Sequence, residues 1–309
     1  MPRVCVIGSA NLDMAMALPR LPRPGETVAG GTMLVNRGGK GANQAVAARL
    51  LGAEVRMIGC VGQDSAGVQI REGLAELGVG VDGLVSVPDV ATGTALILVG
   101  PAGENQIGVA LGANDRLTED LASAHHESIA WADVLLCQLE TPLPAVHWGL
   151  QRAKRHDVTT ILNPAPMCPL TDDLLALVDF LTPNEVEAGA LSGVEVHDVE
   201  TAREAAERLL ARGARRVIVT LGGQGALVCD SEVALHFPAF PVEAVDTTAA
   251  GDAFNGALAV GIAAGGRLEQ AIPLAAAAAA LTCTKRGAQD SLPRRADVER
   301  FLQSLRAAG

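Results

Sequence analysis

Short apolar runs that end in Gly, Pro or a polar residue alternate along this chain with segments of helical periodicity. Each run is continuously apolar, which is typical of a strand buried on both faces of a parallel sheet. The predicted strands are VCVIG at 4–8, VRMIGCVG at 55–62, VLLCQLE at 134–140, TTILNPAP at 159–166, DFLTPNE at 179–185 and VIVTLGG at 217–223. The predicted helices are NQAVAARLLG at 43–52, AGVQIREGLAELG at 66–78, LPAVHWGLQRAKRHD at 143–157 and TAREAAERLLARG at 201–213. This alternation predicts an α/β fold, an αβα sandwich around a mostly parallel sheet.

Two segments interrupt the alternation, residues 14–37 and about 92–110. Both are rich in Gly and Pro, and they contain strand-like pieces such as TALILV and NQIGVAL with no helix between them. We interpret them as a small antiparallel sheet that flanks the main domain as a lid. Repeats, low-complexity linkers and charge runs are absent from the sequence, so we expect a single domain over residues 1–309.

Composition excludes several functional classes. The net charge is −11, and only 2% of residues are aromatic, so binding to nucleic acid or to an anionic membrane surface is not expected. The six cysteines lack CxxC spacing and lie mostly in apolar runs, which favours buried thiols over disulfides or zinc. The six histidines show no metal-ligand spacing. With no charged leader and no apolar stretch of about 18 residues, we expect a cytoplasmic location.

The segment VDTTAAGDAFNGAL at 245–258 is the strongest candidate for a site that binds phosphate. A P-loop is absent, since Lys40 has Leu34 where the first Gly would stand. In the 245–258 segment, small residues precede Asp252 and a helix, so backbone N–H groups at the helix N-terminus can bind an anion. The alternative is that Asp252 is an ordinary helix-start carboxylate.

Polar residues that follow predicted strands form a second group of candidates. Asn11 and Asp13 in GSANLD can bind adjacent hydroxyls, or they form an Asx turn. Lys40 and Asn43 in GGKGANQA lie beside glycines that permit close approach of a ligand, or this segment is a flexible hinge with an N-cap. Glu140 ends a strand, where a solvated charge is the alternative.

A third candidate pair is Asn184 and Glu187 in TPNEVE. Their spacing suits a phosphate and a hydrated magnesium ion. It also suits a helix capping box, which is the more common reason for this spacing.

Six segments, taken in order, resemble the ribokinase branch of the PfkB carbohydrate kinases. They are GSANLD, GGKGANQA, the Glu140 strand end, TPNEVE, TLGGQGAL and DTTAAGDAFNGAL. The resemblance covers essentially the whole chain. It implies a Rossmann-like αβα domain with a β-sheet lid that also forms a homodimer contact. It also implies transfer of the ATP γ-phosphoryl group to the 5-hydroxyl of D-ribose, with Mg²⁺ and a K⁺ activator as cofactors.

The resemblance also implies a role for each matching residue. Asp252 would be the general base, and Ala249, Ala250 and Gly251 the anion hole. The sugar contacts would be Asn11, Asp13, Gly39, Lys40, Asn43, Glu140 and Asp252. ATP would be held by Asn184, Gly251 and the turn with Thr220, Gly222, Gly223 and Gly225, with Glu187 acting indirectly on Mg²⁺. The K⁺ site would involve Asp246, Thr248, Thr282, Lys285, Gly287 and Ser291. The adenine contact near Ala276 stays open.

Two alternatives remain at this stage. One is another sugar kinase of the same fold, acting on deoxyribose, fructose or a nucleoside. The other is a sugar-binding regulator that has lost catalysis, for which loss of the Asp in AAGD would be the sign. Asp252 is present. A carboxylate is needed there because a sugar hydroxyl is a poor nucleophile until a base accepts its proton.

Overall fold

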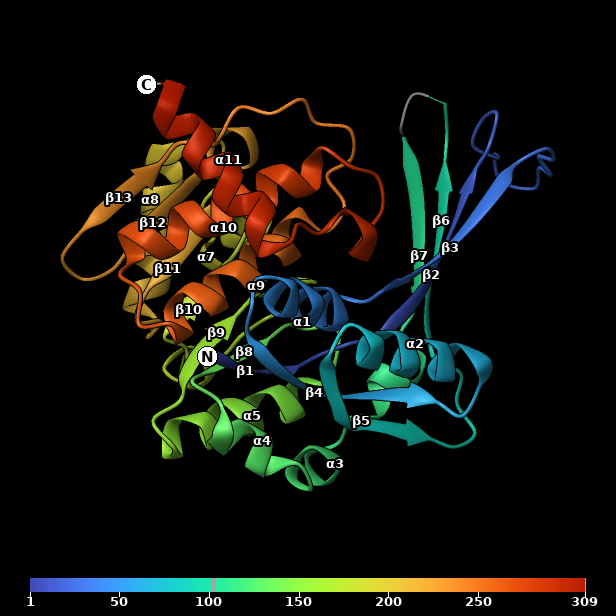
Figure 1. Ribbon diagram of the computed structural model, residues 1–309, viewed down its shortest axis with the longest axis horizontal. Coiled ribbons are helices and arrows are strands. Elements are labelled where there is room, and N and C mark those ends of the chain that lie inside the picture. The colour runs from blue at the N-terminus through green and yellow to red at the C-terminus, as the bar shows by residue number, and fades with distance from the viewer. Residues whose placement is uncertain (102–103, 309) are drawn as a thin grey trace.

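The computed structural model describes residues 1–101 and 104–308 and contains two sheets (Figure 1). The main sheet has nine strands in the order β13-β12-β11-β10-β9-β8-β1-β4-β5. Its strands are β1 (Arg3–Ile7), β4 (Glu54–Gly62), β5 (Val79–Val87), β8 (Val134–Cys137), β9 (Thr159–Leu162), β10 (Phe180–Leu181), β11 (Val217–Thr220), β12 (Ala226–Cys229) and β13 (Ala234–Phe237). The strands from β11 to β5 are parallel, and β12 and β13 form an antiparallel edge. All six strands predicted from the apolar runs are present.

Helices cover both faces of this sheet, so the αβα fold predicted from the sequence is confirmed (Figure 1). The helices are α1 (Lys40–Leu50), α2 (Ser65–Glu76), α3 (Glu119–Ser123), α4 (His126–Trp131), α5 (Leu143–Arg155), α6 (Asp172–Leu175), α7 (Glu185–Ser192), α8 (Val199–Ala211), α9 (Ala250–Ala263), α10 (Leu268–Cys283) and α11 (Arg295–Ala308), with short 3₁₀ turns η1 (Gly112–Arg116), η2 (Gly222–Gln224) and η3 (Gln289–Ser291). Val4 and Val6 of β1 pack in the core that includes α1, α9 and α10, whereas Cys5 and Ile7 pack in the core that includes α5. Burial on both faces explains why the strand sequences are continuously apolar.

The second sheet has four strands in the order β3-β2-β6-β7 and stands out from the body in Figure 1. Its strands are β2 (Asn11–Ala17), β3 (Thr32–Gly38), β6 (Gly93–Val99) and β7 (Asn105–Ala110). They overlap the two predicted lid segments, although β2 begins three residues before residue 14 and β3 ends one residue after residue 37. Residues 102 and 103 of the second segment lie outside the described residues.

The expectation of a purely antiparallel lid is wrong for one pair, because β2 and β6 run parallel. β2 follows β1 and β6 follows β5, and β1 and β5 run in the same direction in the main sheet. The chain therefore leaves the carboxyl ends of both strands in the same direction, which makes β2 and β6 parallel. The β2–β3 and β6–β7 pairs are antiparallel as expected.

A close contact between α1 and α9 sets the geometry on the carboxyl side of the main sheet. A Cβ atom added to Gly256 of α9 would lie 2.6 Å from Cβ of Ala47 and 2.8 Å from the backbone oxygen of Gln44, both on α1. The absence of a side chain therefore lets the two helix backbones approach. One turn before Gly256, this approach brings Asp252 next to the N-terminal turn of α1.

We expect Gly256→Ala to lower the free energy of unfolding by about 1–2 kcal/mol. Alanine favours a helix interior by up to about 1 kcal/mol, but overpacking of a close contact typically costs about 1–3 kcal/mol. Urea unfolding of the two proteins measures the difference. Gly108→Ala on β7, where an added Cβ meets nothing within 4 Å, is the control and should change stability by less than about 0.5 kcal/mol. A Gly256→Ala protein as stable as the wild type would contradict the close-contact account.

Candidate active site

Asp252 is the buried carboxylate at the centre of the candidate site, in the first turn of α9 and 7% exposed. Asn43 Nδ2 donates to its Oδ2 at 2.9 Å, and Gln44 Nε2 donates to its Oδ1 at 2.9 Å. Burial raises the pKa of Asp252, while the charge of Lys40 and the two amides act in the opposite direction. The carboxylate is thus fixed through both oxygens by consecutive residues of α1.

The backbone before Asp252 forms an open helix N-terminus. Ala249 is the N-cap residue and takes a left-handed conformation, φ 60° and ψ 10°, and no side chain caps the helix. The Ala250 N–H donates to the Thr247 carbonyl at 3.2 Å. Gly251 is exposed, and an added Cβ there would meet nothing within 4 Å. Open space therefore borders the first turn at Gly251, and the N–H groups of this turn that are not bonded within the chain can bind an anion there.

Lys40 begins α1 beside the same carboxylate, directly after Gly39, which takes a φ of 88°. The Lys40 backbone N–H donates to Glu140 Oε2 at 3.0 Å, and Ser9 Oγ donates to the same oxygen at 2.5 Å. Burial lowers the pKa of the Lys40 ammonium, but the charges of Asp252, Glu140 and Glu187 outweigh that effect and raise its pKa above the ordinary value. The Lys40 side chain therefore stays positively charged in the midst of carboxylates.

Asn11 and Asp13 lie on β2, where the lid leaves the main sheet. Asn114 Nδ2 donates to Asn11 Oδ1 at 2.7 Å, which leaves Asn11 to act toward a ligand as a hydrogen-bond donor. Burial, followed by the charges of Glu140 and Asp252, raises the pKa of Asp13 to about 6. The structure thus brings the sugar-side candidates from β2, α1 and the end of β8 to one place.

Asn184 and Glu187 form the capping box that the sequence left as an alternative. Asn184 Oδ1 accepts from the Glu187 N–H at 2.8 Å, and Glu187 Oε2 accepts from the Asn184 N–H at 2.9 Å. Burial raises the pKa of Glu187, although the Asn184 N–H and Lys40 oppose it. The capping box uses Asn184 Oδ1 and Glu187 Oε2. Asn184 Nδ2 and Glu187 Oε1 are left for a ligand.

The turn after β11 lies next to this capping box, because Asn184 and Thr220 form a parallel bridge. The turn is closed by the Leu221 N–H, which donates to the Gly225 carbonyl at 2.8 Å. Gly222 and Gly225 have positive φ values of 49° and 98°, and an added Cβ at Gly223 would meet nothing within 4 Å. Apart from Gly251 on α9, the residues expected to bind ATP therefore lie together at the carboxyl ends of β10 and β11.

Two of the residues expected at a monovalent cation site, Thr248 and Gly287, bond to a third, Asp246. Asp246 accepts from the Thr248 N–H and hydroxyl through Oδ1 and from the Gly287 N–H through Oδ2. The buried hydroxyls of Thr282 and Ser291 donate to the carbonyls of residues 278 and 288, while the Lys285 side chain is exposed. Ala276, whose role stayed open, is a half-buried residue of α10. Within residues 1–101 and 104–308, no group of three or more His, Cys, Asp or Glu side chains is arranged to hold a metal ion.

Sequence analysis missed several polar residues that hold the candidates in place. Ser9 and Asn114 contact Glu140 and Asn11, and Gln44 contacts Asp252. Gln44 lies inside the GGKGANQA motif, directly after Asn43, but the burial that sets it apart is visible only in the structure.

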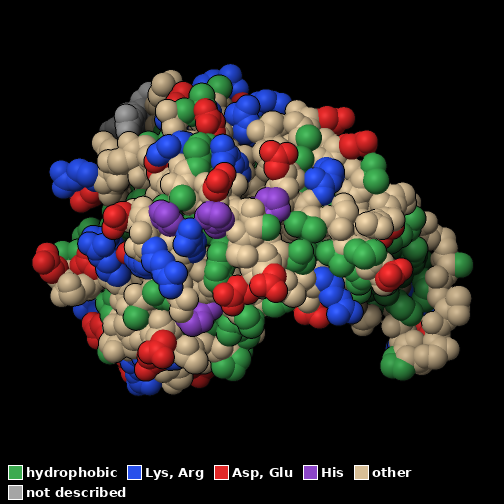
Figure 2. Space-filling model, turned by 90° about the horizontal axis from the view of Figure 1, so that it is seen from below, with side chains coloured by type: hydrophobic (Ala, Val, Ile, Leu, Met, Phe, Trp, Pro, Cys, Tyr) green, Lys and Arg blue, Asp and Glu red, His purple; other side chains and the backbone are tan. Residues whose placement is uncertain are grey.

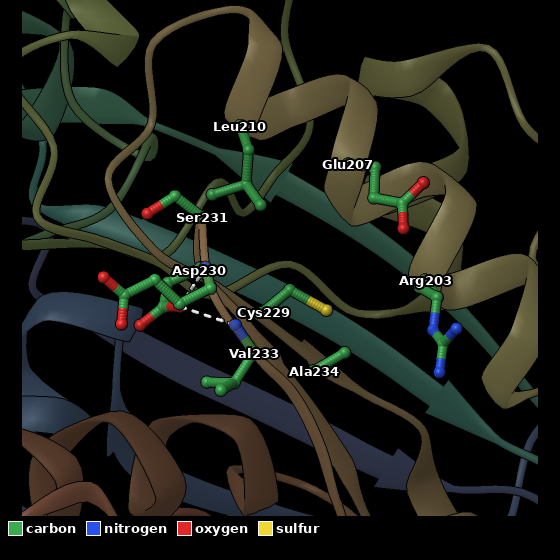
Figure 3. A pocket seen from close by; sticks show the side chains of 9 residues that line it. Arg203, Glu207, Leu210, Cys229, Asp230, Ser231, Val233 and Ala234 are labelled. Atoms are coloured by element: carbon green, nitrogen blue, oxygen red, sulfur yellow. Dashed lines mark hydrogen bonds between the residues drawn. The ribbon is translucent and has the colours of Figure 1, made fainter.

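A separate cavity of about 450 Å³ lies between α8 and the β12–β13 hairpin (Figure 3). It is lined by Arg203, Glu207, Leu210, Cys229, Asp230, Ser231, Glu232, Val233 and Ala234, none of which belongs to the candidate site. The Asp230 carboxylate is used by the backbone N–H groups of Glu232 and Val233. This cavity therefore adds nothing to the chemistry above.

Comparison with known proteins identifies the family. Residues 1–295 match the family described as pfkB family carbohydrate kinase. The chain belongs to the PfkB family of carbohydrate kinases. It is 43% identical over 298 residues to a ribokinase of Haemophilus influenzae, covering 96% of this chain and 97% of that one. It is 35% identical over 303 residues to a deoxyribokinase of Salmonella typhi, covering 98% of both.

A solved structure gives the same result for the fold. The structure of an Arabidopsis thaliana ribokinase complexed with ribose and ATP is similar with a TM-score of 0.92 and 34% identity, covering 97% of this chain and 98% of that one. No helix in the described part of the chain is long and apolar enough to cross a membrane.

We expect Asp13→Asn to raise the melting temperature at pH 7–8. The pKa of Asp13 is raised from 3.8 to about 6, so above that pH the folded wild type holds a carboxylate that is less favourable there than in the unfolded chain. As the pH falls through about 6 toward 4, the folded wild type takes up this proton first and gains stability. The advantage of the variant should therefore shrink over this range.

Thermal unfolding followed from pH 4 to pH 8 measures the effect. Asp82→Asn, which replaces an exposed carboxylate on β5, is the matched control and should show no comparable pH-dependent difference. A constant difference between Asp13→Asn and the wild type at every pH would rule out the raised pKa of Asp13.

Proposed function

We propose that this protein transfers the γ-phosphoryl group of ATP to the 5-hydroxyl of D-ribose. The observation that carries the proposal is the buried Asp252 carboxylate, which lies at an open helix N-terminus beside Lys40. The full-length similarity to ribokinases, one of them solved with ribose and ATP, supports this choice of sugar and donor.

An unpaired amide oxygen supports a sugar site next to Asp252. Asn43 Oδ1 is buried without a hydrogen-bond partner among the described residues, and such an orphan acceptor costs about 1–3 kcal/mol unless a ligand satisfies it. A sugar hydroxyl is a suitable donor. Asp13 and Glu140 would accept from other hydroxyls, while Asn11, Lys40 and the Gly39 backbone would complete the set.

Asp252 would act as the general base. As the 5-oxygen of ribose forms its bond to the γ-phosphorus, the hydroxyl proton passes to the Asp252 carboxylate. The bond from phosphorus to the oxygen bridging the β- and γ-phosphates breaks, and ADP leaves with that electron pair. The backbone of Ala249, Ala250 and Gly251 would face the charge on the transferred group, where fixed N–H dipoles are most effective.

Glu187 fits a magnesium ion bound to ATP, while Asn184 and the turn at Thr220–Gly225 would hold the nucleotide. The capping box uses only Oε2 of Glu187, so its second oxygen is left for the ion or for a water on it. Mg²⁺ commonly keeps several waters and takes one or two carboxylates together with phosphate oxygens, so a single protein carboxylate suffices. When bound, the ion neutralises charge on the phosphate oxygens.

We also propose K⁺ binding beside the anion hole. The Val245 and Asp246 N–H groups both donate to the Cys283 carbonyl, so the loop before α9 is tied to the end of α10. The side chains of Asp246, Thr282 and Ser291 already bond to the chain, so the backbone carbonyls of this region would supply most ligands. An ion there would stabilise the loop that presents the anion hole.

The second sheet would act as a lid and as the contact of a homodimer. Leu34 and Leu96 are 62% and 56% exposed, and the strand register places them on opposite faces of the sheet. Apolar side chains also gather over the right half of Figure 2, the side on which Figure 1 places this sheet. Exposed apolar side chains grouped on one sheet are typical of a protein–protein interface. We propose a second copy of the chain as the partner. The cytoplasmic location stays a prediction.

We expect Asp252→Asn to lower kcat about 10²- to 10⁴-fold, because removal of a general base typically has an effect of this size. Ribose binding, measured by calorimetry, should weaken far less, since other polar groups hold the sugar. A variant that keeps more than about a tenth of wild-type kcat would show that Asp252 is only a helix-start carboxylate. A wild type without kinase activity would instead indicate a non-catalytic sugar binder.

D-ribose and 2-deoxyribose distinguish the proposal from its nearest rival, a deoxyribokinase. The 2-hydroxyl is the group that 2-deoxyribose lacks, and its absence would leave Asp13 or Asn11 unpaired. Because an unpaired buried polar group costs about 1–3 kcal/mol, kcat/KM should be about tenfold or more higher for ribose. Equal kcat/KM values for both sugars at saturating ATP would contradict the ribose assignment.

A further inference from the structure

A closed set of buried amide hydrogen bonds lies directly behind Asp252. Gln44 Nε2 bonds both Asp252 Oδ1 and, at 3.1 Å, Asn163 Oδ1. Asn163 Nδ2 donates to the Thr182 carbonyl at 3.1 Å, and Thr182 Oγ1 donates to Asn255 Oδ1 at 2.6 Å. Asn255 Nδ2 donates to the carbonyl of residue 251 at 2.9 Å. The chain of hydrogen bonds that begins at Asp252 therefore ends on the residue before it, at the start of α9.

Gln138 and Asp252 together fix the direction in which the Gln44 amide points, because one donates to its oxygen and the other accepts from its nitrogen. Gln138 Nε2 donates to Gln44 Oε1 at 2.6 Å, and both side chains are fully buried. With its oxygen turned toward Gln138, Gln44 must present its NH₂ group to Asp252 and Asn163. If the Gln44 amide were reversed, its oxygen would face the Asp252 carboxylate, and the two acceptors would repel each other.

The strand ends explain how these residues come together. Gln138, Asn163 and Thr182 are the first residues after β8, β9 and β10, which are neighbours in the parallel sheet. They therefore form one row along its carboxyl edge, beneath α1 and α9. The Gln138 amide packs against Gly8, and a side chain at that glycine would occupy the same space.

We infer that Gln44 is a positioning residue for phosphoryl transfer, and that Gln138 acts on the reaction only by orienting the Gln44 amide. This inference rests on the proposed role of Asp252. The Gln44 amide is already bonded to Gln138, Asn163 and Asp252, which leaves it no donor or acceptor for the sugar. Its effect would therefore be on the placement and ionisation of the carboxylate and not on ribose affinity.

Other charged groups around Asp252 set the background for its titration. The charge of Lys40 on α1 favours the ionised form of Asp252, whereas the charge of Glu140 after β8 opposes it. The Asp252 charge also raises the pKa of Asp13 on β2 and of Glu187 on α7. The Gln44 bond favours the ionised form. Its removal should raise the pKa of Asp252, so the base would ionise only at higher pH.

Gln44→Met, Gln138→Met and the double variant test the inference with ribose and ATP. Gln44→Met should lower kcat about 10- to 100-fold, a typical loss when a supporting hydrogen bond is removed, while the KM for ribose changes less than about threefold. The acid limb of the kcat–pH profile should move to higher pH. Gln138→Met should show the same changes to a smaller extent, and the double variant should match Gln44→Met within about twofold.

Thr160→Val is the matched control for loss of a buried hydrogen bond. Thr160 is fully buried near the start of β9, at the amino-terminal end of the strand and away from Asp252. Its hydroxyl donates to the Leu177 carbonyl at 2.7 Å. This variant should lower the melting temperature but leave kcat and its pH profile unchanged. If Gln44→Met does not fold, Gln138→Met alone carries the test, because it does not contact Asp252.

The outcomes separate this inference from the proposed function. If Asp252→Asn is inactive but Gln44→Met keeps wild-type kcat and the wild-type acid limb, the positioning role is wrong. Losses that multiply in the double variant would show that Gln138 acts independently of Gln44, which also overturns the inference. If the wild type does not phosphorylate ribose, or if Asp252→Asn stays active, the proposed function fails and this inference fails with it.

Discussion

The close packing of α9 against α1 at Gly256 is the contact on which the candidate site depends. It places consecutive residues of α1, Asn43 and Gln44, on the two oxygens of Asp252. The same first turn of α9 supplies the backbone N–H groups proposed to face phosphate. One helix–helix contact therefore sets the distance between the proposed base and the proposed anion site, which would act in a single reaction step.

Negative charge is concentrated around this contact. Asp13, Glu140, Glu187 and Asp252 act electrostatically on one another or on Lys40, and burial raises the pKa of three of these carboxyls. Buried carboxylates destabilise a fold unless they are paired, so the site is held at a cost in stability. The proposed ligands would offset this cost, because a sugar would supply hydroxyl donors and a magnesium ion on the nucleotide would supply positive charge.

How many strands of the main sheet could be predicted from the sequence depended largely on their burial. β1, β4, β8, β9, β10 and β11 were predictable because burial on both faces makes them continuously apolar. β5 and β13 were missed, since β5 mixes exposed and buried residues and β13 is an exposed edge, and β12 was missed although its four residues are all buried. Site candidates such as Asp13 and Glu140 could be found from their place after strands. The spacing of Asn184 and Glu187 already favoured a capping box, because those two residues are only three apart. Sequence could not show that Gln44 and Gln138 hold Asp252, because that role depends on contacts between distant segments.

Phosphorus NMR of the product formed from D-ribose and ATP tests the central claim most directly, because it reports both the reaction and the oxygen that was attacked. The account predicts one phosphomonoester whose phosphorus couples to the two protons on carbon 5, formed in equal amount with ADP. ADP release that ribose does not accelerate, or a phosphate attached to any other oxygen of the sugar, would contradict it.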